Sequence, residues 1–131
     1  MGIKVSSAKA KGRNFQKFIC EKISEVFGID WGYEDDKLIQ PRIMGQKGVD
    51  IVLRGEMVTL FPYDVECKAT ENIRLYADIK QARTNMKPGR NWLLFHKRSH
   101  EKPIVIMDAE VFFRLTDECT KAEKKKVCRC E

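Results

Sequence analysis

Apolar and polar residues recur with different periods along this chain, and each period predicts an element. The first apolar stripe has helical spacing and predicts a helix from residues 7–10 to Phe27, ended by Gly28. The stripe consists of Phe15, Phe18, Ile19, Ile23 and Val26. Later alternating or continuous apolar runs predict strands, and two further helical patterns accompany them. The expected strands are residues 38–43, 49–54, 59–68, 92–96 and 103–107, and the expected helices are 73–86 and 108–115.

The order of these elements indicates an α/β layer fold around a mixed sheet. With 131 residues the chain is long enough for one core, so we expect a single domain over residues 1–131. No apolar run approaches the roughly 20 residues that span a bilayer, and the first residues lack the apolar stretch of a signal peptide. We therefore expect a cytoplasmic protein that does not bind membranes.

The strand at residues 61–68 carries the strongest candidate chemistry. Its alternation places Asp64, Glu66 and Lys68 on one face and apolar residues on the other. Burying two carboxylates and an ammonium without partners is costly, so a water-filled cleft that holds a cation explains this face best. Asp50, on the preceding strand, adds another carboxylate. We expect Asp64 to support the site or to stay exposed rather than to bind a second metal.

An acid and a lysine two residues apart are not specific by themselves. The same spacing occurs at Asp35, Asp78 and Glu123. These matches fall in a loop-like charge run, a predicted helix and a basic tail. Only Glu66 follows a strand that carries a lone aspartate, so its context selects this match. The alternative is a surface ion pair, which would contribute little to stability and would leave the strand pattern unexplained.

The net charge of +6 is concentrated at the two ends of the chain. The only charged residues in 1–13 are basic, and residues 121–131 are rich in lysine. Basic ends around an acidic site suit a polyanion that is held at its flanks while a metal acts at the centre. We expect residues 1–10 and 119–131 to be flexible, and the alternative is that these ends only aid solubility.

The five cysteines are an odd number in a chain without a secretory signal, which argues against a disulfide framework. Cys20 and Cys67 fall at apolar positions and are expected in the core. Cys119, Cys128 and Cys130 do not have the spacing of a known zinc site.

Asp50 and the Glu66-Cys67-Lys68 strand, behind a helix opened by Lys11-Gly12-Arg13, resemble the PD-(D/E)XK nuclease superfamily. More narrowly, the chain is similar to Holliday-junction-resolvase-like endonucleases and their small phage-borne relatives over most of residues 10–115. The resemblance implies a restriction-endonuclease-like core, a central mixed sheet of four or five strands flanked by helices. It also implies an Mg²⁺- or Mn²⁺-dependent DNA endonuclease that acts as a homodimer on branched DNA, such as a four-way junction. A phage-encoded enzyme acting in the host cytoplasm fits the same likeness.

The chain departs from the family pattern at two positions. Val49 stands where the superfamily usually has a proline, which does not affect the chemistry. Gln16 stands near the position where archaeal resolvases have a glutamate on the first helix. A glutamine cannot supply a negative charge, although its carbonyl oxygen can accept a hydrogen bond from a metal-bound water.

The expected catalytic residues are Asp50, Glu66, Lys68 and Gln81. Asp50 and Glu66 would bind the metal, and the resemblance implies the backbone carbonyl of Cys67 as a further ligand. Lys68 would orient or deprotonate the attacking water and stabilise the developing negative charge. Gln81 would hydrogen-bond this water or a phosphate, and the alternative is an ordinary exposed glutamine.

Basic and amide side chains around this site are the expected DNA contacts. Lys80, Arg83 and Lys87 form a basic stripe at helical spacing, which Arg90 extends beyond the Pro88-Gly89 break. The stripe is either a phosphate-binding surface or a solvated face. No segment resembles a base-reading helix or an aromatic stacking platform, so we expect recognition of DNA structure or phosphate. The full set is Lys11, Arg13, Gln16, Gln46, Lys47, Lys80, Arg83, Lys87 and Arg90.

Two other classes of function are alternatives. A non-catalytic DNA-binding module with the nuclease fold would not need Asp50, Glu66 and Lys68, yet all of them are present. A nuclease subunit of a larger DNA-processing complex is the other alternative, because one small domain leaves little room for substrate specificity.

Overall fold

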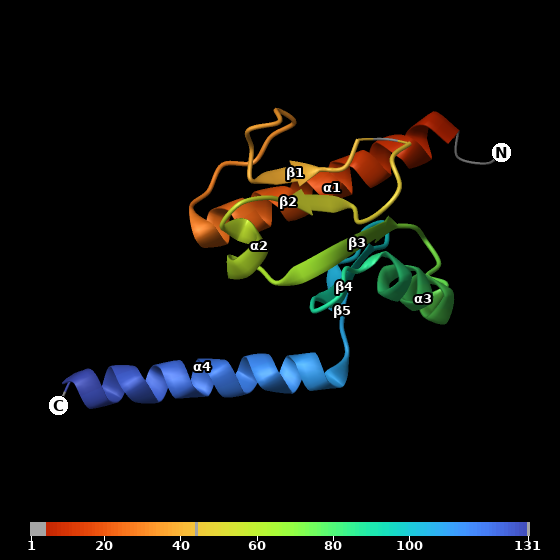
Figure 1. Ribbon diagram of the computed structural model, residues 1–131. Helices are drawn as coiled ribbons and strands as arrows, with labels where there is room; N and C mark the ends of the chain where they lie inside the picture. The colour runs from red at the N-terminus through yellow and green to blue at the C-terminus, as the bar shows by residue number, and fades with distance from the viewer. Residues whose placement is uncertain (1–4, 44, 131) are drawn as a thin grey trace.

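The computed structural model describes residues 5–43 and 45–130, and the side chains of residues 7–43 and 45–126. Lys4, Cys128 and Cys130 therefore lie outside the described side chains. The elements are α1 (Val5–Phe27), β1 (Ile39–Pro41), β2 (Ile51–Leu53), α2 (Met57–Leu60), β3 (Tyr63–Ala69), α3 (Leu75–Asn85), β4 (Asn91–Lys97), β5 (Ile104–Ile106) and α4 (Ala109–Cys130) (Figure 1). They form an α/β structure with a mixed three-stranded sheet and a two-stranded sheet flanked by helices, which confirms the predicted fold class at this level.

The strands form two sheets that meet at Asp50. β3 pairs in parallel with β4, and β4 pairs antiparallel with β5. β1 and β2 form a separate antiparallel pair. The backbone N–H of Asp50 donates to the carbonyl of Val65 over 2.9 Å and links this pair to β3. Helix α3 makes the crossover between the parallel strands β3 and β4, because parallel neighbours need a long connection.

Helix α1 packs its apolar stripe against β3 and the β1–β2 pair. Phe15 and Ile19 are buried in one cluster with Val65 of β3. The stripe is narrower than predicted, because Val26 is 76% exposed. Gly28 ends the helix as predicted, and its φ of 66° lies in the left-handed region that glycine adopts without strain.

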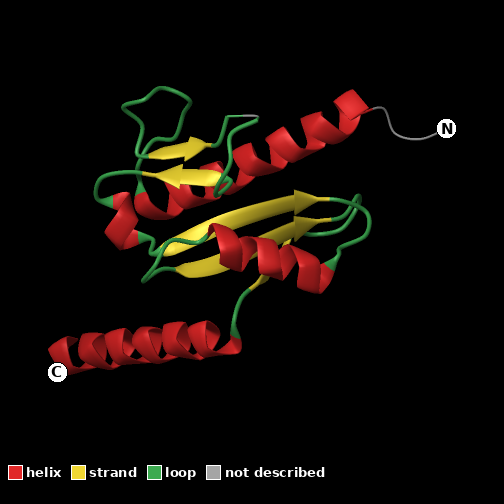
Figure 2. Ribbon diagram, turned by 45° about the vertical axis from the view of Figure 1, so that its right-hand side comes forward, coloured by secondary structure: helices red, strands yellow, loops and turns green. Residues whose placement is uncertain are grey.

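Helix α3 covers the opposite face of the three-stranded sheet (Figure 2). Ile79 of α3 packs against Leu94 of β4. Glu66 is the partner of Leu94 in the β3–β4 ladder, so the two side chains share a face. The two-residue period of a strand places Asp64 and Lys68 on this face as well. The predicted polar face of β3 therefore looks towards α3, away from α1.

The predicted strand at residues 59–68 starts too early. Residues 57–60 form the short helix α2, and β3 begins only at Tyr63. Met57 is fully buried, and the N–H of Phe61 donates to its carbonyl over 3.0 Å. Because the chain turns here to bury the Met57 side chain, it cannot yet be extended.

The last helix is longer than predicted, since α4 continues well beyond Leu115. Many of the added residues are lysine, glutamate or alanine, which are good helix formers. Lys121 also pairs with Asp117, one turn earlier, over 2.8 Å. Within the ends that were expected to be flexible, residues 5–10 and 119–130 are helical.

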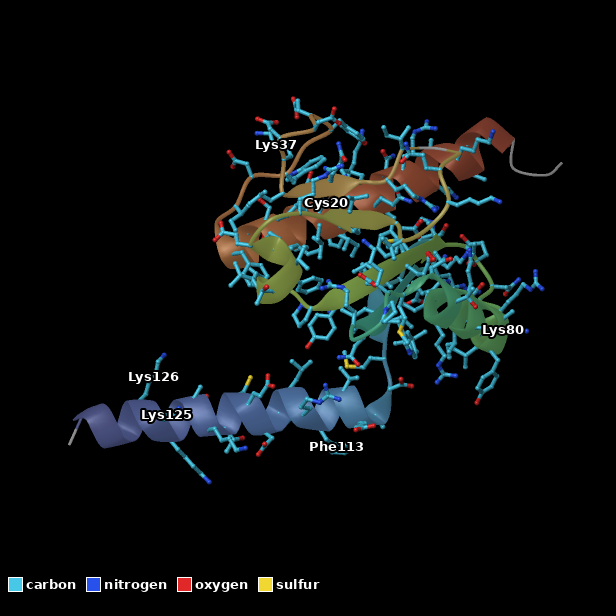
Figure 3. All side chains as sticks on the ribbon, viewed as in Figure 1. Cys20, Lys37, Lys80, Phe113, Lys125 and Lys126 are labelled. Atoms are coloured by element: carbon cyan, nitrogen blue, oxygen red, sulfur yellow. The ribbon has the colours of Figure 1, made fainter. Side chains whose placement is uncertain are left out.

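Helix α4 stands apart from the layers formed by the other elements (Figure 1). Val111 near its start is buried, whereas Phe112 and Phe113 are 53% and 67% exposed. Figure 3 shows Phe113 pointing away from the sheets. Among the helices of the described residues, none is long and apolar enough to cross a membrane.

Candidate active site

Asp50 and Glu66 lie side by side where the two sheets meet. Asp50 directly precedes β2, and its Oδ2 accepts the backbone N–H of Cys67 over 2.7 Å. This contact fixes the Asp50 carboxylate against β3 and next to Glu66. Only 5% of Asp50 and 2% of Glu66 is exposed. Burial, followed by the neighbouring Asp50 carboxylate, raises the pKa of Glu66 to about 7.

Arg42 pairs with the Asp50 carboxylate, and Asn85 donates a hydrogen bond to the Glu66 carboxylate. No role was predicted for either residue from the sequence. Arg42 Nη2 lies 2.9 Å from Asp50 Oδ1, and Asn85 Nδ2 donates to Glu66 Oε1. Both side chains also donate to the backbone carbonyl of Gly48. They therefore attach the glycine-flanked loop to the carboxylate pair and fix the shape of the site.

The sequence does contain signals for both residues. In an antiparallel pair centred on the loop at residues 43–49, Arg42 falls opposite Asp50, and its backbone N–H donates to the Asp50 carbonyl over 2.9 Å. Asn85 follows Gln81 by four residues, which places both on one face of α3. The register of the hairpin therefore predicts Arg42 beside Asp50, and the period of the helix predicts Asn85 beside Gln81.

Lys68 and Gln81 form the other half of the site. Lys68 Nζ donates to Gln81 Oε1 over 2.8 Å. The positive charge of Lys68 lowers the pKa of Glu66, but by less than burial and Asp50 raise it. The four side chains that the sequence predicts as catalytic are thus in one place, at the contact of β3 with α3 and the β1–β2 pair.

Asp64 and Arg90 form a buried ion pair, so Asp64 is not exposed, which was one of the two expectations for it. Arg90 Nε lies 2.8 Å from Asp64 Oδ1, and the Lys87 N–H donates to Asp64 Oδ2 over 2.7 Å. Three further N–H groups of Arg90 donate to the carbonyls of Val58, Phe61 and Tyr63. Both Asp64 oxygens and four of the five N–H groups of Arg90 therefore have partners within the protein.

The predicted basic stripe is not continuous, because α3 ends at Asn85 and Met86 already has an extended backbone. Arg83 Nη2 pairs with Asp108 Oδ1 over 2.9 Å and stacks on Trp92, with 5.5 Å from its guanidinium carbon to the ring centroid. Asp108 also accepts from Trp92 Nε1 over 3.1 Å. Lys80 extends outward from α3 (Figure 3).

A basic cavity of about 260 Å³ lies beside the carboxylate pair. The residues that carry its charge or hydrogen-bonding groups are Arg42, Gln46, Lys47, Asn85, Lys87 and the structural pair Asp64 and Arg90. Arg42 and Asn85 belong to both this cavity and the carboxylate site. A phosphate held by Lys47 or Lys87 would therefore be close to Asp50 and Glu66.

The predicted residues of α1 lie on the helix that packs against the apolar face of β3. Lys11 and Arg13 are exposed on the first half of the helix, and Lys11 lies near Glu71, whose pKa it helps to lower. Gln16 is half-buried. Among the described residues, no hydrogen bond joins Gln16 to Asp50 or Glu66.

The carboxylate pair fits a hard divalent cation. Within the described part of the chain no three His, Cys, Asp or Glu side chains cluster around a common point, but Mg²⁺ is commonly held by one or two carboxylates together with waters and phosphate oxygens. The N–H and C=O of one strand residue point to the same edge. The Cys67 carbonyl therefore faces the edge on which its N–H meets Asp50.

Comparison of the chain with protein-family models, with curated proteins and with solved structures found no match. The chemistry of the site therefore has to follow from its own residues.

Replacing Arg90 by alanine should destabilise the fold. Removal of the guanidinium leaves the buried Asp64 carboxylate uncompensated, which typically costs about 3–5 kcal/mol. Urea unfolding would measure the loss, with Lys80→Ala as an exposed control that should match the wild type. An Arg90→Ala protein of normal stability would contradict this structural role.

The pKa of Glu66 predicts how stability changes with pH in the metal-free protein. The folded-state pKa of about 7 is above the ordinary value of 4.5, so the folded state holds this proton more tightly than the unfolded state. Stability should therefore fall as pH rises from about 4.5 to 7, relative to Glu66→Gln. Chemical unfolding of both proteins across this range measures the difference, and a rise in the relative stability of the wild type would contradict the assignment.

Proposed function

We propose that this protein is an endonuclease that hydrolyses phosphodiester bonds in DNA with the help of Mg²⁺ or Mn²⁺. The observation that carries the proposal is the pair of buried carboxylates, Asp50 and Glu66, beside the Lys68–Gln81 pair and the basic cavity. Two carboxylates suit a divalent cation, and basic side chains next to them suit a phosphate. Asp50 and Glu66 would not by themselves stabilise the sheet, because two like charges are buried together.

A divalent ion on Asp50 and Glu66 would neutralise charge at the phosphorus and lower the pKa of the attacking water. Glu66 has to release its proton before it can act as a ligand, and its pKa of about 7 allows this near neutral pH. Asp50 is already oriented, because the Cys67 N–H and Arg42 hold its two oxygens. The Cys67 carbonyl faces the same edge and is the proposed backbone ligand.

Lys68 is the proposed catalytic cation of the chain itself. Gln81 Oε1 fixes the Lys68 ammonium over 2.8 Å, and the ammonium has two more N–H donors for a phosphate oxygen or the attacking water. Charge that develops on the phosphate in the transition state is stabilised by such a prearranged donor. The amide NH₂ of Gln81 is available to orient the water or to bind the same phosphate.

The neighbouring phosphates are assigned to the basic cavity. Lys47, Gln46 and Lys87 line it, and Lys80 extends from the adjacent helix (Figure 3). Such contacts position the backbone of the DNA and carry little sequence information. Arg90 also lines this cavity, but four of its five N–H donors are used within the protein, so we assign it a smaller part in DNA binding.

A restriction-endonuclease-like core and a homodimer belong to the same proposal. The hydrogen bond from Asp50 to Val65 places the β1–β2 pair next to β3 and supports one continuous sheet. One site in each chain cuts one strand, so symmetric cleavage of a four-way junction would need two chains. The exposed Phe112 and Phe113 on α4 support association with another chain, either a second copy or a larger complex.

Cleavage of DNA in Mg²⁺ should require Asp50 and Lys68. Asp50→Asn removes a ligand charge and Lys68→Ala removes the catalytic cation, so each should lower the rate by about 100-fold or more. Supercoiled plasmid, linear, flapped and four-way substrates should be compared under the same conditions. Asp35→Asn and Lys37→Ala are matched controls, since they repeat the acid and lysine spacing in a loop, and both should cut like the wild type.

The outcomes separate the rival classes of function. Undiminished cleavage by Asp50→Asn and Lys68→Ala would place the activity elsewhere and refute the proposed site. DNA binding that weakens with salt, without cleavage by the wild type, would favour a non-catalytic binding module. Cleavage that appears only after a partner protein is added would favour a subunit of a larger complex.

A further inference from the structure

A second and larger cavity lies on the α1 side of the sheet, with a volume of about 600 Å³. It is enclosed by the first half of α1, the end of β3 and the turn between β4 and β5. Its apolar lining comes from Ala8, Phe15, Phe18, Ala69 and Pro103. Its polar lining comes from Lys11, Asn14, Thr70, Glu71, Lys97 and Ser99. An apolar cavity of this size with a few polar groups is typical of a site for a small organic group.

Hydrogen bonds hold the walls of this cavity in place. Glu71, after β3, accepts from the backbone N–H of Ser99 over 3.3 Å and from the Ser99 hydroxyl. His96 Nε2 donates to the Thr70 carbonyl over 2.8 Å. Lys97 closes the turn after β4 by donating to the Glu101 carbonyl over 2.7 Å. Because these contacts exist without a ligand, binding would not include the entropic cost of ordering the cavity walls.

Phe18 gives the cavity an accessible aromatic ring. It is 36% exposed, whereas Phe15 beneath it is buried. The two ring centroids lie 6.3 Å apart with 17° between the planes. Lys22 Nζ lies 5.5 Å from the Phe18 ring centroid, and a base that stacks on this face would displace the exposed Lys22 side chain. A nucleobase can stack on such a ring whatever its sequence. Asn14 has amide groups for the edge of a base, and Lys11 has an ammonium for its phosphate. This aromatic platform was not expected from the sequence.

The cavity and the candidate active site reach the same end of β3. Lys68 faces α3, whereas Ala69, the next residue, faces the opposite side of the sheet and lines the cavity. A DNA strand that passes the end of β3 with its scissile phosphate at Lys68 could therefore bring an adjoining nucleotide round this end to the cavity. A base within a duplex is stacked and paired and cannot enter, whereas an unpaired base enters at little cost.

We propose that this cavity binds the base of an unpaired nucleotide next to the scissile phosphate. The substrate class would then be DNA with a single-stranded segment at the cut site, such as a flap or an opened branch point. This inference rests on the proposed endonuclease and specifies the DNA that it selects. Lys11 in the cavity lining offers an ammonium for a phosphate next to the base, whereas the Lys97 ammonium donates to two backbone carbonyls and Glu71 accepts from Ser99.

The test compares binding of two DNAs without metal, so that no cleavage occurs. One is a duplex with a short single-stranded flap that carries the fluorescent base 2-aminopurine beside the branch point, and the other is the fully paired duplex. The wild type should bind the flapped DNA about tenfold more tightly, as expected for one stacked base, and should quench its fluorescence. Phe18→Ala should lose both effects and keep its affinity for the paired duplex. Val26→Ala, an exposed apolar position on the same helix, should retain both.

Equal affinity of the wild type for the two DNAs would overturn the proposal, as would flap binding and quenching that survive in Phe18→Ala. Quenching of 2-aminopurine within the paired duplex would show that the cavity does not select unpaired bases. Plasmid cleavage in Mg²⁺ is measured in parallel. If cleavage is normal and Phe18→Ala has no effect, the cavity assignment fails alone. If Phe18→Ala has the predicted effect but the wild type cuts no DNA, the endonuclease proposal fails instead.

Discussion

The contact of Asp50 with β3 is the interaction on which the rest of the site depends. The Asp50 backbone donates to Val65 over 2.9 Å, and its carboxylate accepts from the Cys67 N–H over 2.7 Å. These two hydrogen bonds join the β1–β2 pair to the three-stranded sheet and set a second carboxylate beside Glu66. Burial, together with this proximity, raises the pKa of Glu66. Asp50 therefore both joins the two sheets and completes the pair of carboxylates.

The distribution of charge around this contact explains how the protein holds two buried carboxylates. Arg42, Asn85 and Lys68 each face one side of the pair or its neighbourhood. Among the described residues, every buried side-chain nitrogen and oxygen has a hydrogen-bond partner within the protein. Arg90 has the same type of charge, yet its donors end on Asp64 and on backbone carbonyls. The position of a basic side chain, rather than the number of basic residues, therefore decides whether its donors are free to bind another group.

Local periodicity was sufficient to predict much of this site. Alternation along residues 61–68 placed Glu66 and Lys68 on one face, and context along the sequence added Asp50. The pairing of Asp64 with Arg90 depends on a turn in which Gly89 has a φ of 79°, and no periodic pattern encodes that approach. The helix at residues 57–60 depends on burial of Met57, which is a tertiary effect. The larger cavity combines three segments that are distant in sequence, so only the folded chain reveals it.

The most direct measurement is a calorimetric titration of Mn²⁺ into the protein at pH 8, without DNA, where Glu66 is ionised. Uptake of the ion by the wild type, and its loss in Asp50→Asn and in Glu66→Gln, is the expected result, because each variant replaces one ligand charge. Lys80→Ala should bind like the wild type. Absence of uptake by the wild type, even when DNA is supplied, or equal uptake by the two carboxylate variants, would contradict a metal site at Asp50 and Glu66.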